Sequence, residues 1–241
     1  MTTYLNGNNL TDANRNLLIL TVYLIVVVYT LFQMVLSLAE EVSIKLDQES
    51  LNSQLVVQNL QDIIGIQFRF ERSFPLVQLR ELAINIENKS PNRLVAVEWD
   101  ACSLTDFSGR SRRVVRLPPG MMLDLSQKQV PSPINPNQTL KERITAEDIL
   151  QRDANGGALK IAGVLLDIPK LKQGIPTERK RYNEFATGKA DFDFTLQLRL
   201  RLLETNHSTH EPVFCTLACH FTIKKLTWIE ALRAKPKIVT R

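Results

Sequence analysis

The sequence contains few of the residues on which catalysis and disulfide frameworks depend. Only three cysteines and three histidines occur in 241 residues. Three cysteines are too few for a disulfide framework in a chain of this length, and three histidines leave little material for acid–base catalysis. We also find no P-loop, no dinucleotide-binding glycine pattern and no serine in a glycine-flanked elbow. We therefore predict that the protein is not an enzyme and uses no cofactor.

Charged residues, glycine and proline are all absent between Leu17 and Ala39. Fifteen side chains in this stretch are leucine, isoleucine, valine or phenylalanine. A helix of this length spans about 34 Å, which is enough for the ~30 Å hydrocarbon core of a bilayer. The sequence therefore predicts a transmembrane helix over residues 17–39, preceded by a polar tail over residues 1–16.

A cleaved signal peptide is the alternative interpretation of the same stretch, because Ser37 and Ala39 have the spacing of a cleavage site. The apolar run is, however, longer than the roughly 7–15 residues of a signal peptide. The membrane orientation depends on few charges. Arg15 precedes the helix, and Lys45 is the only cation close after it. This bias favours a cytoplasmic N-terminal tail and a domain in the periplasm, a lumen or the cell exterior.

Residues 40–63 mix short stretches of strand-like and helix-like spacing, and we interpret them as a partly helical stalk. From residue 64 onward the apolar residues recur mainly with a period of two. Between residues 192 and 202 they occupy even positions, and between residues 213 and 223 they occupy odd positions. This alternation predicts a long antiparallel hairpin. The fold expected over residues 64–225 is a mainly β, antiparallel β-sandwich of immunoglobulin-like type.

Basic residues gather in three places, and the chain carries a formal net charge of +5. They lie around a turn and strand near residue 113, in a long loop over residues 169–181, and in an amphipathic tail over residues 226–241. They predict contact with lipid headgroups or an acidic protein, and Gln33 is a candidate contact within the apolar helix. The candidate contact residues are Gln33, Arg110, Arg112, Arg113, Arg116, Arg179, Lys180, Arg181, Trp228, Arg233, Lys235 and Lys237.

The motifs that resemble chemical sites have simpler explanations. Cys215 and Cys219 precede His220 as in a haem-attachment motif, but with one residue too many between them. Both cysteines fall on the apolar face of the predicted strand, which favours core packing. A disulfide from Cys102 to either of them stays open as an alternative. His207 and His210 lie in a polar hairpin loop, so no metal site is predicted.

These observations favour a non-catalytic, single-pass membrane protein. Its β domain is expected to assemble, stabilise or scaffold a larger membrane protein complex. The expected partners are the lipid bilayer and other membrane proteins. Nucleic acid is excluded, because the basic residues are not interleaved with exposed aromatic residues. The alternative is a protein that binds lipid or a small apolar ligand at the membrane surface.

Overall fold

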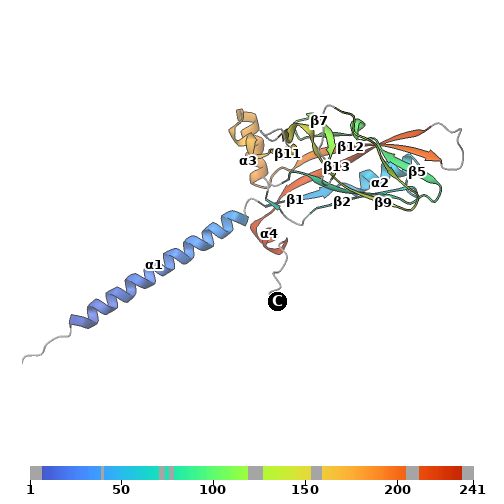
Figure 1. The fold of residues 1–241 in the computed structure, drawn as a ribbon. Helices are drawn as coiled ribbons and strands as arrows, with labels where there is room; N and C mark the ends of the chain where they lie inside the picture. Colours follow the sequence, from blue (N-terminus) through green and yellow to red (C-terminus); the bar gives the residue numbers. More distant parts are fainter. Residues whose placement is uncertain are drawn as a thin grey trace, which may run out of the picture.

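The computed structural model describes residues 7–38, 41–70, 74–75, 79–118, 127–152, 159–204 and 212–234. It shows a long helix, α1, that projects from one end of an elongated β domain (Figure 1). Helices α3 (Pro176–Ala186) and α4 (Trp228–Ala234) lie at this same end, which we call the proximal end. The opposite end, where β5 (Arg93–Val97) lies, is the distal end.

Helix α1 spans Gly7–Leu38, and its segment Asn16–Met34 is long and apolar enough to cross a membrane. None of that segment is buried inside the chain. The hydroxyls of Thr21 and Thr30 donate to the carbonyls of Leu17 and Val26, one helical turn back. The helix thus includes residues 7–16, which the sequence analysis assigned to the polar tail. No glycine or proline follows Gly7 before Leu38 to interrupt it.

We expected a stalk over residues 40–63, but the described residues in this range form a strand and a helix of the β domain. Strand β1, Glu41–Leu46, pairs antiparallel with the last strand of the sheet. Helix α2, Gln48–Val57, follows, with Asp47 accepting a hydrogen bond from the Ser50 N–H at 3.0 Å. Leu51 and Leu55 of α2 are buried in the core. Their contacts come from strands far along the chain, so local spacing alone did not predict them.

The strands form one long antiparallel path that is nearly closed into a barrel. Its order is β2-β4-β9-β7-β6-β12-β13-β1-β3, with β5 pairing to β12 and β8, while β10 and β11 form a separate pair. The immunoglobulin-like topology is therefore not confirmed. The bounds are β2 Ile64–Arg69, β3 Phe74–Pro75, β4 Leu82–Asn88, β5 Arg93–Val97, β6 Ser103–Thr105, β7 Ser111–Arg116, β8 Ser132–Ile134, β9 Thr139–Ala146, β10 Leu150–Arg152, β11 Leu159–Ile161, β12 Phe192–Glu204 and β13 Val213–Lys225.

The predicted hairpin is confirmed, because β12 and β13 pair from Phe192 opposite Ile223 to Leu202 opposite Val213. Their apolar faces form much of the core. The Phe194 and Phe221 rings stack there with centroids 4.6 Å apart. The gap between the layers beside Leu196 is too small to admit a water molecule.

The prediction of a loop over residues 169–181 is wrong, because most of these residues are helical. A 3₁₀ helix, η4, spans Pro169–Gln173, and α3 spans Pro176–Ala186. Pro176 opens α3, and the Glu178 carboxylate accepts a hydrogen bond from the Ile175 N–H at 3.0 Å. Phe185 is the buried residue of α3, so the helix lacks the apolar periodicity that would have revealed it. Two further 3₁₀ turns are η2 Trp99–Ala101 and η3 Glu147–Ile149, and α4 spans Trp228–Ala234.

Candidate functional site

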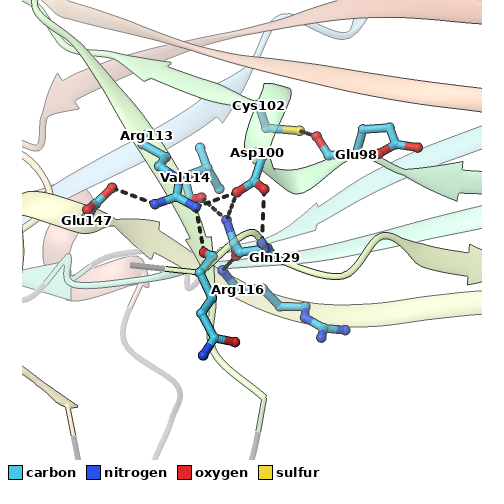
Figure 2. Close-up of polar contacts among 9 residues, drawn as sticks. Glu98, Asp100, Cys102, Arg113, Val114, Arg116, Gln129 and Glu147 are labelled. Atoms are coloured by element: carbon cyan, nitrogen blue, oxygen red, sulfur yellow. Dashed lines mark hydrogen bonds and ion pairs between the residues drawn. The ribbon is translucent and has the colours of Figure 1, made fainter. Parts of the chain in front are cut away.

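Arg113, on β7, forms an internal ion-pair network rather than an open basic patch (Figure 2). Its Nη2 lies 2.5 Å from Asp100 Oδ1, and its Nη1 lies 3.3 Å from Glu147 Oε2. The Gln129 backbone N–H donates to Asp100 Oδ2 at 3.0 Å. Burial acts to raise the pKa of Asp100, but hydrogen bonds from Arg113 and Gln129 outweigh it, so the pKa lies below its ordinary value. The network joins β7 to the turn at Asp100 and to the segment before β8.

Arg116 extends the same network toward the core. Its backbone N–H donates to Gln129 Oε1 at 2.9 Å, and its guanidinium donates to Ser132 Oγ at 2.8 Å. The buried Trp99 donates its indole N–H to that same Ser132 oxygen at 2.8 Å. Arg116 also lies 3.3 Å from Glu142. The Arg116 guanidinium therefore forms a hydrogen bond and an ion pair within the domain.

Arg112 and Arg110 share one carboxylate, Asp148. Arg112 is nearly buried, with Nη1 3.3 Å from Asp148 and Nη2 donating to the Leu165 carbonyl at 2.6 Å. Arg110 lies 3.3 Å from Asp148 on the other side, and its side chain is 67% exposed. Of the four arginines predicted here as one contact surface, Arg110 therefore remains the most open to solvent. A contact of these arginines with lipid or a partner stays a prediction.

A cleft of about 610 Å³ lies beside Arg110 and Arg112, between the turn after β6 and the η4–α3 segment. Two carboxylates in this cleft already accept hydrogen bonds from nearby backbone N–H groups. Asp106 accepts from the Arg110 N–H at 3.2 Å, and Asp167 accepts from the Lys170 N–H at 3.1 Å. The described residues that line this cleft include no histidine or cysteine. The lining has mixed charge, and the Ser108 hydroxyl donates a hydrogen bond to the Asp106 carboxylate at 2.5 Å.

Arg179, Lys180 and Arg181, which we predicted to lie on a loop, lie on α3 and have different surroundings. Arg179 and Lys180 are exposed, and Lys180 lies 4.0 Å from Glu184. Arg181 instead donates to the Phe107 carbonyl at 3.3 Å and lies 5.4 Å from the centre of the Phe192 ring. Arg181 therefore attaches α3 to the β domain, whereas its two neighbours face solvent.

The remaining predicted contact residues lie on the two end helices. Gln33 is exposed on α1, and Arg233 is exposed on α4. Trp228 begins α4, which lies within the tail expected over residues 226–241. The side chain of Trp228, and Lys235 and Lys237 entirely, lie outside the described residues, as do His207 and His210.

Sequence reasoning missed an exposed apolar surface at the distal end. It comprises Val56 and Val57 at the end of α2, and Val213 and Phe214 at the start of β13, which are 48–81% exposed. We call it the distal apolar surface. Gln58 joins its two halves by donating to the Thr216 carbonyl at 3.0 Å. Strand alternation placed Val213 in the core, but at this strand end it remains 64% exposed.

The cysteines are core residues, as predicted. All three are free and buried, so the disulfide alternative is wrong for this structure. Cys102 donates to the Glu98 carbonyl at 3.3 Å, and burial raises its pKa to about 11. Among the described residues, no group of three or more histidine, cysteine or acidic side chains forms a metal site. No protein family and no curated protein matches this chain.

Proposed function

We propose that the protein is a non-catalytic, membrane-anchored β domain that helps to assemble, stabilise or scaffold a larger membrane protein complex. The observation that carries the proposal is the apolar segment Asn16–Met34, none of which is buried in the described part of the chain. Leu17 and Tyr23, for example, are 65% and 67% exposed. Apolar surface of this extent is unfavourable in water. It requires cover from lipid, from a neighbouring helix, or from both.

The connection between helix and domain supports an anchoring role. Only residues 39 and 40 separate the end of α1 from the start of β1. The Cα atoms of Leu38 and Glu41 are therefore at most about 11 Å apart. With α1 in a bilayer, the proximal end stays close to the membrane surface, and the distal end extends away from it. The bias of Arg15 over Lys45 favours a cytoplasmic N-terminus and an extracytoplasmic domain.

The distal apolar surface supports a protein partner. Isolated exposed valines are common on soluble domains, but Val56, Val57 and Val213 are exposed on two elements joined by the Gln58–Thr216 hydrogen bond. Phe214 points to the opposite face of β13 from Val213, and its ring lies 5.1 Å from the Arg199 guanidinium. A cleft of about 370 Å³, lined partly by Leu60, Leu202 and Val213, lies next to it. An apolar side chain of a partner would fit this cleft and lose its contact with water.

The test is recovery of a complex from native membranes. The full-length chain is crosslinked in membranes, extracted in a mild detergent and sized with its bound proteins. We expect a specific complex for the wild type and its loss for the Val57→Asp/Val213→Asp variant. Val130→Asp is the matched control, because Val130 is 72% exposed outside the distal apolar surface. A chain that migrates alone would contradict the proposal.

A further inference from the structure

The η4–α3 segment, residues 169–186, carries an excess of positive charge, with five basic and two acidic side chains. Of the two acidic side chains, Glu184 lies 4.0 Å from Lys180, and Glu178 accepts a hydrogen bond from the Ile175 N–H. Among the basic ones, Arg181 packs on Phe107 and Phe192. All five cations are exposed, and the four without this aromatic contact are Lys170, Lys172, Arg179 and Lys180.

An exposed apolar side chain lies among these cations. Ile175 occupies the turn between η4 and α3 and is 62% exposed. The Glu178 cap holds the backbone of this turn, so Ile175 is presented from an ordered structure. A large apolar side chain flanked by lysine and arginine is the composition of segments that lie in a membrane interface. We call Lys170, Lys172, Ile175, Arg179 and Lys180 the interfacial surface.

Tertiary contacts hold the interfacial surface at the proximal end. Phe185 of α3 lies against Phe192, at the start of β12, with ring centroids 4.9 Å apart. The α1 helix enters the domain at this same end (Figure 1). Helix α4, which contacts α1, adds the exposed Arg233 and the 44% exposed Ile229 there. Two separate elements thus present cations and an isoleucine beside the anchor.

We propose that the interfacial surface binds the anionic headgroups of the bilayer in which α1 is anchored. The four cations contact lipid phosphates, and Ile175 enters the boundary between headgroups and acyl chains. The contact would hold the β domain in one orientation on the membrane and direct the distal apolar surface away from it. This inference rests on the proposed anchoring by α1 but not on the proposed protein partner.

The test uses the purified full-length chain in nanodiscs, where no protein partner is present. An Ile175→Cys variant is labelled with an environment-sensitive fluorophore, since the native cysteines are buried. In discs that contain phosphatidylglycerol we expect a blue-shifted emission and at least about a threefold fall in quenching by aqueous iodide. Discs of phosphatidylcholine alone, or high salt, should give a smaller change because the attraction is electrostatic.

Charge reversal separates this contact from a nonspecific effect. Adding Arg179→Glu and Lys180→Glu should restore iodide quenching, whereas Lys128→Glu with Lys141→Glu, also exposed cations, should leave it unchanged. Thermal unfolding checks that each variant is folded. A label that stays accessible to iodide in anionic discs overturns the lipid contact and leaves the proposed complex intact. A chain that does not enter discs overturns the anchoring and both proposals together.

Discussion

Gln54 of α2 forms two hydrogen bonds to the backbone of Ala218, 164 residues away on β13. Its Nε2 donates to the Ala218 carbonyl at 2.8 Å, and its Oε1 accepts from the Ala218 N–H at 2.8 Å. Strand β1 pairs with β13 only as far as Phe221, so this side chain takes the place of a missing strand neighbour. Gln58 likewise takes the place of a strand neighbour by donating a hydrogen bond to the Thr216 carbonyl. Helix α2 thereby covers an edge that would otherwise expose unpaired backbone groups.

Gln54→Ala should lower the free energy of unfolding by about 2 kcal/mol, because it removes two hydrogen bonds to a part-buried backbone. Urea unfolding of the full-length protein in detergent measures the change. Gln48→Ala is the control, since Gln48 bonds only to the exposed Asn52 side chain. If both variants unfold like the wild type, Gln54 does not support the β13 edge.

The Asn88 side chain is fully buried at the end of β4, where its amide joins β4 to β5 and β8. Its Nδ2 donates to the carbonyls of Arg93 and Ile134, at 2.7 and 2.9 Å, and its Oδ1 accepts from the Ser90 N–H. We expect Asn88→Ala to cost about 2–4 kcal/mol of unfolding free energy, because it leaves buried backbone groups unpaired. Asn85→Ala, on the half-buried outer position of the same strand, should cost much less by the same denaturant measurement.

The burial of the Asn88 side chain also predicts that one glycosylation sequence is not used in the folded domain. Asn88-Lys89-Ser90 has the pattern of a glycosylation acceptor. In the folded domain the Asn88 side chain is enclosed and its N–H groups are used. A glycan at this nitrogen is incompatible with the structure. Expression in a eukaryotic secretory pathway, followed by mass analysis, should therefore find folded protein unmodified at Asn88.

The Asp100 network should make stability depend on acid pH. Burial alone would raise the pKa of Asp100, but the bonds from Arg113 and Gln129 lower it below the unfolded value of about 3.9. Its contribution is therefore present above that value and is lost as the pH falls through the lower folded pKa. We expect about 1 kcal/mol, since the group is 32% exposed and partly screened. Urea unfolding at pH 6 and pH 3 should show a smaller difference for Asp100→Asn than for the surface variant Asp62→Asn.

The three thiols should be unreactive in the folded state. Burial raises the pKa of Cys219 to about 12, and those of Cys102 and Cys215 to about 11. At pH 8 a thiol reagent should modify none of them until denaturant is added. The exposed Ile175→Cys thiol provides a positive control. Because folding raises these pKa values, stability should also fall as the pH rises above the unfolded value of about 8.5.

Local patterns predicted the elements whose own residues specify them. The apolar run beginning at Leu17 and the alternation along β12 and β13 each repeat over many residues. Such repeats indicate helix or strand before any partner is known. Helix α3 was not predicted because its residues are largely exposed, and β1 was assigned to the stalk although it pairs with β13. Both features depend on packing that no local period records.

The sequence by itself determined that an uninterrupted apolar helix precedes a mainly antiparallel β domain with buried cysteines. Side-chain periodicity and hydrophobicity are sufficient for these properties, because each acts within one segment. Only the tertiary structure decided how the basic residues are used. Arg112, Arg113 and Arg116 meet carboxylates from distant segments, whereas Arg179 and Lys180 remain exposed. Neutralisation of a charge depends on which residues meet in space, and that is a property of the whole fold.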